Sequence, residues 1–272
     1  MVTIHYTAGG VAARAGAVSR SLTQATFAAL SAPSVSDTQP WRWRINEDRI
    51  ELYADWRRQL ADIDPDGRLL LISCGAALHH TRVALAAEGV GVDILRFPGS
   101  SDPDLLTELR YTGPVERAPR SGALYRAIAV RRSDQRPIVG GFVPGRDLTL
   151  LREAAEQVGA GAYTLTGQEL PGSVNETAYV VITTPGVARN DWLTAGEAVS
   201  AVLLTAVAAG LATASVSDVT AIARHRAPRR LPAAGRYPAA AIRVGVAGRV
   251  GDRPVTQPRA PVVPAPGTQE PS

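Results

Sequence analysis

The stretch LLLISCGAALHHTRVALAAEG, residues 69–89, decides the fold. Its apolar and small residues run without a proline until a glycine ends them, which predicts a buried helix over Leu69–Glu88. A short apolar run, Val92–Leu95, predicts a strand directly after it. Three acidic residues precede the helix but lack the glutamate of a calcium loop, so they are interpreted as a turn leading into it: Asp62, Asp64 and Asp66.

A second stretch, WLTAGEAVSAVLLTAVAAG over residues 192–210, has the same pattern. Gly196 follows Gly75, and Gly210 follows Gly89, by the same 121 residues (196 − 75 and 210 − 89). An apolar segment again comes next. Any two alanine-rich helices match to some degree. Because both glycine pairs share one offset, we interpret the chain as a degenerate internal duplication.

Other patterns predict an α+β protein. Alternating apolar and polar residues on both sides of a polar turn predict a β-hairpin. Asp147 is a candidate N-cap of a later helix. The expected strands are 41–45, 49–53, 105–111, 179–182 and 239–246, and the further helices are 21–30, 123–131 and 147–157.

The expected organisation is one fused domain with irregular ends. Residues 1–17 are Gly/Ala-rich without a clear period, which predicts a poorly ordered lead. Residues 253–272 carry six prolines, a spacing that excludes a helix or a central strand and predicts an extended arm or a tail. Between them, 18–252 would hold the two halves, about 18–118 and 119–252.

Composition narrows the class of protein. The 272 residues are 45% hydrophobic and 20% charged, which is ordinary for a globular chain. We expect a cytoplasmic protein without a membrane partner, because we see no bilayer-length apolar run and no secretory signal. The single cysteine, Cys74, excludes an internal disulfide and a multi-thiolate metal site.

The basic balance raises the question of a nucleic-acid partner. The pI is about 9.6 and the net charge +4, and all 29 basic residues are arginine. No cluster of basic residues with interleaved aromatics occurs, so we expect no nucleic acid and rank such a module last among the alternatives.

Two distant segments suggest the walls of one pocket. Residues 32–43, APSVSDTQPWRW, form a turn-rich loop that leads into an aromatic strand and can grip a flat ring. Residues 128–137, IAVRRSDQRP, carry adjacent guanidinium groups and a hydroxyl, which can hold a phosphate through forked hydrogen bonds. At the offset of 121, their counterparts, 158–162 and 10–12, lack this chemistry. We therefore expect one complete pocket, built across the two halves.

These motifs resemble the nitroreductase-like flavoproteins, and more closely their single-chain branch often called Acg, in which two nitroreductase-type halves are fused. The resemblance spans about residues 23–261. It implies mixed, mainly antiparallel sheets flanked by helices, with FMN as cofactor, NAD(P)H as reductant, and a nitroaromatic or quinone as the small-molecule electron acceptor. It also implies a monomer that mimics the family dimer, or a weak homodimer. The matching segments are TQPWRW (38–43), ISCGAALHH (72–80), RRSDQRP (131–137), WLTAGEA (192–198) and AGL (209–211).

The same resemblance assigns cofactor-binding residues. The arginine-serine cluster would hold the FMN phosphate and ribityl chain, and a C-terminal arginine would also reach the phosphate. The loop and the glycine that closes the second long helix would approach the isoalloxazine ring. No catalytic side chain and no metal ligand is expected, because the flavin carries the chemistry. The full set is Asp37, Thr38, Gln39, Pro40, Arg131, Arg132, Ser133, Gln135, Gly210, Leu211 and Arg259.

Three departures from the family pattern leave an alternative open. Asp37 replaces an asparagine whose amide donates to the flavin; an ionised carboxylate only accepts, unless it is protonated or turned toward Arg42 or Arg44. Gln135 replaces an arginine of the phosphate site. The stretch 167–178 is too short for the lid of longer relatives. The alternative is a flavin-binding or flavin-sequestering protein with little or no turnover.

Several conspicuous side chains are interpreted as structural. Trp41 and Trp43 alternate on one strand face, so core packing is favoured over stacking on a flavin. Cys74 lies among apolar helix residues, which predicts a core thiol rather than a nucleophile. For His79 and His80, a packed structural role is favoured over a catalytic one.

Overall fold

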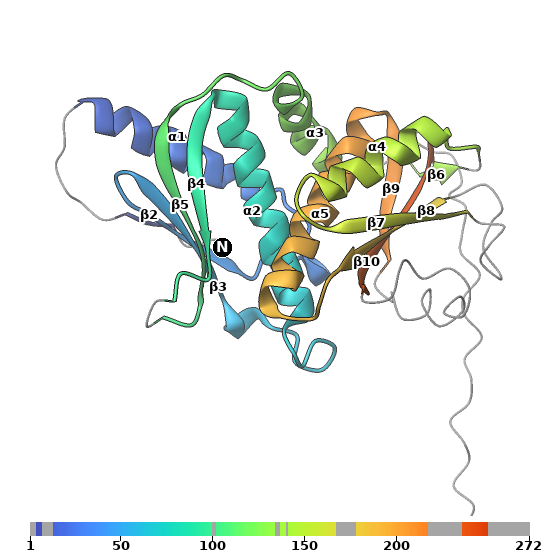
Figure 1. Ribbon diagram of the computed structural model, residues 1–272, viewed down its shortest axis with the longest axis horizontal. Coiled ribbons are helices and arrows are strands. Elements are labelled where there is room, and N and C mark those ends of the chain that lie inside the picture. The colour runs from blue at the N-terminus through green and yellow to red at the C-terminus, as the bar shows by residue number, and fades with distance from the viewer. Residues whose placement is uncertain are drawn as a thin grey trace, which may run out of the picture.

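The computed structural model describes residues 4–6, 13–99, 102–133, 137–139, 141–166, 178–216 and 236–249. Two sheets lie on either side of a central pair of long helices (Figure 1). The first part of the chain forms β1 (Ile4–Tyr6), α1 (Ala13–Ala29), β2 (Trp41–Ile45), β3 (Arg49–Ala54), α2 (Arg68–Glu88), β4 (Val90–Arg96) and β5 (Leu105–Pro114). The second forms α3 (Ser121–Ser133), β6 (Ile138–Val139), α4 (Gly145–Glu156), β7 (Gly161–Thr166), β8 (Ala178–Thr184), α5 (Arg189–Ala208), β9 (Leu211–Val216) and β10 (Tyr237–Ala247).

The two sheets share one topology. Strands β2-β3-β5-β4 lie in the same spatial order as β7-β8-β10-β9, and every one of these neighbouring pairs is antiparallel. Outside this common set, β1 adds to β2 in parallel and β6 adds to β10. The predicted α+β class, with mainly antiparallel sheets and flanking helices, is confirmed.

The central contact is between α2 and α5, which cross between the sheets (Figure 1). Gly75 and Gly196 face each other there. A Cβ on Gly75 would collide with the carbonyl oxygen of Leu193, and a Cβ on Gly196 with that of Ile72. Each Cβ would also come within 2.9 Å of the other glycine's Cα. Because each residue meets its own counterpart, the two helices pack like the matching elements of a two-fold dimer.

Several boundaries differ from the sequence prediction. Helix α1 begins at Ala13 rather than Ser21, and β1 lies inside the segment 1–17 expected to be irregular. An alanine-rich segment has high helix propensity, which a search for periodicity misses. Asp147 is not the N-cap of α4, which begins at Gly145 with Pro144 before it. Asp147 lies in the first turn, where a carboxylate favours the positive end of the helix dipole.

The acidic turn before α2 caps that helix. The carboxylate of Asp64 accepts hydrogen bonds from the backbone N–H groups of Leu69 and Leu70, both at 2.9 Å. Gly67 precedes the helix with φ of +70°, a conformation that costs little without a Cβ. The predicted turn leading into the helix is confirmed.

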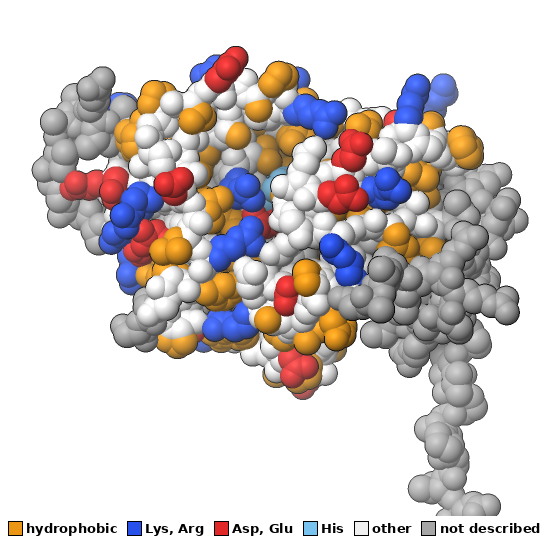
Figure 2. All heavy atoms as spheres, viewed as in Figure 1, with side chains coloured by type: hydrophobic (Ala, Val, Ile, Leu, Met, Phe, Trp, Pro, Cys, Tyr) orange, Lys and Arg blue, Asp and Glu red, His pale blue; other side chains and the backbone are white. Residues whose placement is uncertain are grey.

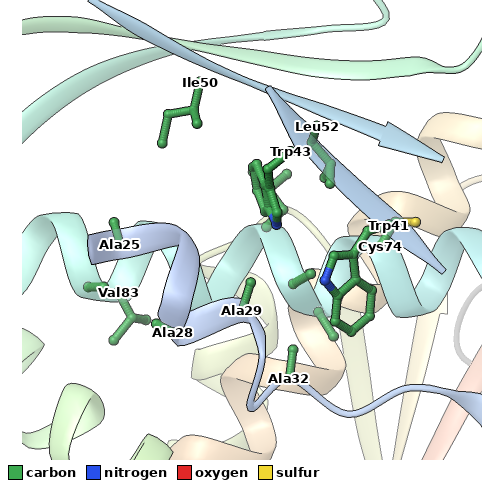
Figure 3. Close-up of a cluster of buried hydrophobic side chains, with 14 of the residues drawn as sticks. Ala25, Ala28, Ala29, Ala32, Trp41, Trp43, Ile50, Leu52, Cys74 and Val83 are labelled. Atoms are coloured by element: carbon green, nitrogen blue, oxygen red, sulfur yellow. The ribbon is translucent and has the colours of Figure 1, made fainter. Parts of the chain in front are cut away.

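The first core lies between the first sheet, α1 and α2. Trp41 and Trp43 both point from β2 into it, beside Ala29 of α1 and Cys74 of α2 (Figure 3). Each tryptophan is only 1% exposed. Burial raises the pKa of the Cys74 thiol well above its usual value, so the group is an uncharged core atom. The predicted structural roles of these three side chains are confirmed.

Helices α2 and α5 are long and apolar enough to cross a membrane by length and composition alone, contrary to the expectation that no run reaches that span. In each, 78% of the apolar window is buried inside the structure. Core helices of soluble proteins pass the same test, so this feature is weak support for a membrane segment.

Candidate functional site

The α1–β2 loop, residues 30–40, has an unusual backbone. Ser36, Asp37 and Gln39 have φ angles of +48°, +54° and +45°. Each non-glycine residue in this region costs about 1–3 kcal/mol and persists only where its surroundings hold it in place. The strain therefore concentrates where the sequence predicts a ring-gripping loop.

Hydrogen bonds fix this loop from several sides. The backbone N–H of Gln39 donates to Ser34 Oγ at 3.0 Å, and its side-chain Nε2 donates to the Leu30 carbonyl at 3.1 Å. The N–H of Val35 donates to Ser73 Oγ of α2 at 3.2 Å. These hydrogen bonds hold the loop in its strained shape.

The loop also has two further anchors from outside it and an exposed tip. Arg58 donates to the Thr38 carbonyl at 3.0 Å, and the thiol of Cys74 lies 3.2 Å from the Pro40 carbonyl oxygen. The side chain of Asp37, by contrast, is exposed. Residues 38–40 therefore form a rigid edge, and Asp37 stands free of the core.

The suggestion that Asp37 turns toward Arg42 or Arg44 is wrong. Arg42 lies 3.8 Å from the carboxylate of Asp104, and Arg44 lies 3.4 Å from Glu51. Asp104 and Glu51 therefore lie closer to these two arginines, which point outward from β2, than Asp37 does. Within the described residues, the carboxylate of Asp37 makes no ion pair.

The arginine-bearing end of α3 lies against this loop. The guanidinium of half-buried Arg131 donates to the carbonyl of Ser31. The neighbouring carbonyl, of Leu30, is the one that accepts from Gln39. The two segments that the sequence analysis joins into one pocket therefore meet at a single turn. Arg132 and Ser133 complete the helix, but their side chains lie outside the described residues, as do Gln135 and Arg259 entirely.

The polarity of α3 decides what can bind an anion here. Its last turn ends in carbonyl groups, which carry the negative end of the helix dipole. A phosphate at this end gains nothing from backbone N–H groups, unlike one at a helix start. Binding would depend on the guanidinium charges of Arg131 and Arg132. An arginine pair is the side-chain chemistry that fits FMN phosphate at such a position.

Gly210 and Leu211 lie at the junction of α5 and β9. Gly210 has φ of +79° and ends the helix, as Gly89 does with +75° after α2. Among the described residues, and apart from its chain neighbours and its own helix, no atom lies within 4 Å of a Cβ placed on Gly210, so this side of its backbone is open to an approaching group. Leu211 is buried in the sheet. Among the described residues, no hydrogen bond joins this pair to the α1–β2 loop.

The two histidines of α2 share a partner that the sequence analysis missed. The Nδ1 atoms of His79 and His80 both lie 2.8 Å from Oγ of Ser200 on α5. Ser200 follows His79 by 121 residues, the offset of the glycine pairs, and that offset is the signal that could have found it. Burial lowers the pKa of His79 to about 3 and that of His80 well below its usual value. Both are neutral at pH 7, in keeping with the structural role predicted for them.

A buried carboxylate also ties the halves together. Glu197 of α5 is fully buried and pairs with Arg82 of α2 and Arg96 of β4. Arg96 also donates to Thr194 Oγ1 at 2.8 Å. An acid in the apolar middle of a helix predicts such a pairing, because an unpaired buried charge is too costly.

Two matching sheets thus lie around a two-fold-like pair of helices, and the strained loop of the first half meets Arg131 of the second half. No protein-family model matches the chain. It is 42% identical over 133 residues to the Mycobacterium tuberculosis protein named "Putative NAD(P)H nitroreductase Rv3131", an alignment covering 48% of this chain and 38% of that protein.

Two further relatives come from the same organism. The chain is 28% identical over 308 residues to "Putative NAD(P)H nitroreductase acg", covering 86% of this chain and 91% of that protein. It is 35% identical over 122 residues to "Uncharacterized protein Rv3127", covering 43% and 35%. With the fold, these similarities support a nitroreductase-like family with Acg-type architecture for this chain.

Proposed function

We propose that this chain is an FMN-dependent NAD(P)H oxidoreductase that passes hydride through the flavin to a nitroaromatic or quinone-type acceptor. The observation that carries the proposal is the meeting of Arg131 with the strained α1–β2 loop at Leu30 and Ser31. The names of the relatives support the coarser part of the proposal, an NAD(P)H nitroreductase activity. The proposal includes a cytoplasmic chain without nucleic-acid or membrane partners, acting as a monomer that mimics a dimer or as a weak homodimer.

The chain's own contribution is to position the cofactor. When bound, FMN supplies the hydride-transfer chemistry. Arg131, Arg132 and Ser133 would hold its phosphate and ribityl chain, and Arg259 would add a charge to the phosphate. Because Gln39 Nε2 already donates to a backbone carbonyl, this side chain holds the loop in shape. The rigid edge formed by residues 38–40, with Asp37 next to it, would then face the ring.

The alternative function is flavin binding or sequestration with little turnover. The exposed carboxylate of Asp37 favours it, because a negative charge at the ring disfavours the anionic reduced flavin. A cofactor that is bound but hard to reduce would follow from this charge.

Anaerobic stopped-flow absorbance separates the functions. The purified protein is loaded with FMN and mixed with NADH or NADPH, and a nitroaromatic or a quinone is then added. The proposed enzyme bleaches the flavin band and regains it with the acceptor. Bound flavin that neither nucleotide reduces would support sequestration. A protein that retains no FMN after reconstitution would contradict both.

A further inference from the structure

A groove lies on the far side of α2 from the candidate flavin site. The α2–β4 groove is enclosed by α2, β4, the start of α3 and the end of α4, and has a volume of about 860 Å³. Figure 2 shows the hollow near the centre of this face, with hydrophobic side chains on its floor. Small-molecule sites commonly fall between about 300 and 1,000 Å³. The apolar part of its wall includes Val83, Ala86, Val90, Val92, Leu124 and Val158.

The internal symmetry explains why a groove exists here. Val90 opens β4 after Gly89, as Leu211 opens β9 after Gly210. The opposite wall of the groove comes from the α4–β7 loop, residues 157–160. This loop precedes β7 as the α1–β2 loop precedes β2. The groove therefore occupies the position that corresponds, under the internal symmetry of the two halves, to the candidate flavin site.

The groove does not reproduce the flavin chemistry. The α4–β7 loop is only residues 157–160, whereas its counterpart runs over 30–40. Among the described residues of these two loops, every non-glycine residue with a positive φ lies in the α1–β2 loop. The arginine-serine cluster corresponds by sequence to Gly10-Val11-Ala12, which carries no charge. A second FMN would therefore lack its phosphate site.

The charges around the groove favour an anion. Two guanidinium groups line it, from Arg82 and Arg120, and the described lining residues include no carboxylate. Arg82 is committed to Glu197. Arg120 is exposed and its side chain has no hydrogen-bonding or ionic partner among the described residues. His79 also lines the groove and is neutral at pH 7, since burial and then Arg82 lower its pKa to about 3.

We propose that the α2–β4 groove binds an aromatic carboxylate, with its ring between the apolar faces of α2 and β4 and its carboxylate against Arg120. A helix face opposite a strand face makes a slot suited to a flat ring, and Arg120 offers the forked donor geometry that a carboxylate accepts. The site follows from the symmetry of the halves and does not depend on the proposed flavin chemistry.

Equilibrium dialysis with 2-naphthoate tests the site, with neutral 2-naphthamide as the matched probe. The full chain is used in the presence of excess FMN, so that the candidate flavin site does not compete. We expect naphthoate to bind about two- to fivefold more tightly than the amide, the upper part of the range for an exposed ion pair. Arg120→Gln should remove this preference, and Arg126→Gln, an exposed change on α3, which begins just after Arg120, should retain it.

A second variant tests the apolar slot. Ala86→Phe places a ring inside the groove and should abolish binding of both probes, with an unfolding midpoint close to that of the wild type. Equal binding of acid and amide, or naphthoate binding that survives both Arg120→Gln and Ala86→Phe, would overturn the proposal. A second FMN per chain that disappears in Ala86→Phe would overturn it as well. None of these results depends on whether the protein turns over NAD(P)H.

Discussion

The α1–β2 loop and the α4–β7 loop occupy corresponding places on two copies of one scaffold, yet they are built differently. The first is long, strained at Ser36, Asp37 and Gln39, and in contact with Arg131. The second is a short connection of four residues. Helices α2 and α5 of the two copies still meet through the matched pair Gly75 and Gly196. The packing between the halves is thus symmetric, whereas the chemistry beside it is not.

The largest expected effect is on the free energy of unfolding. It concerns Glu197, whose ion pairs have no counterpart in the otherwise symmetric contact between α2 and α5. Glu197 corresponds to Ala76 and holds two arginines of the first half. Glu197→Ala should lower the free energy of unfolding by about 3–5 kcal/mol, because Arg82 and Arg96 lose their buried partner. Urea denaturation measures this. Glu197→Gln keeps the shape and should cost less; a cost below about 1 kcal/mol for the alanine variant would mean that the cluster does not join the halves.

The next effect tests the symmetry itself. Gly75→Ala and Gly196→Ala should each destabilise the protein by about 1–3 kcal/mol or more, because either Cβ meets backbone that cannot move aside easily. Thermal and urea unfolding compare the two. Gly122→Ala on α3 is the control, since its Cβ would find only the end of Arg126 at 3.7 Å. Strongly unequal costs for the two central glycines would break the equivalence of α2 and α5.

A smaller effect concerns the titration of His79, whose counterpart Ser200 does not titrate. Its pKa is about 3 in the folded chain and 6.5 in the unfolded one, so the unfolded chain binds one more proton between these values. Stability should fall as pH drops below about 6.5, by about 1.4 kcal/mol per pH unit for this one group. His79→Asn should reduce the slope by that amount, and Ser200→Ala should not. An unchanged slope in His79→Asn would show that the imidazole is not neutral in the folded state.

The smallest effect concerns the loop tip. Asp37→Asn should tighten FMN binding by roughly two- to tenfold, since the amide adds one donor where the carboxylate only accepts. Stability should change little, because asparagine tolerates the left-handed backbone. Val158→Asn, the corresponding change in the short loop, should leave FMN affinity unaltered. Fluorescence titration with FMN compares the three proteins, and weaker binding by Asp37→Asn would mean that this position does not face the flavin.

Much of the fold could be predicted because periodic signals are local. The long helices, the β2–β3 hairpin and the offset between halves follow from apolar spacing and paired glycines. The start of α1 and the N-cap of α4 were misplaced, since alanine-rich and proline-led helix starts lack the polar caps that mark a boundary. Strand β7 was not singled out, because its short run of small and hydroxyl residues has little apolar contrast.

The site was predictable in part. Loop and arginine chemistry marked residues 37–40 and 131–133, but the hydrogen bonds that hold Gln39 and Arg131 go to carbonyls of one turn, and backbone carbonyls leave no sequence signal. The pairing of His79 with Ser200 could have been found from the offset. The α2–β4 groove could not have been predicted from the sequence. Its shape depends on how the α1–β2 and α4–β7 loops, which differ in length, let the halves pack together.

The most direct test of the central claim is the FMN content per chain, measured by absorbance after reconstitution and gel filtration. Wild type and Arg126→Gln should each retain one FMN, and the Arg131→Gln, Arg132→Gln double variant should lose most of it, because the phosphate would then lie at the carbonyl end of α3 without its guanidinium partners. Equal FMN content in all three proteins would contradict a cofactor seated between that helix end and the strained loop.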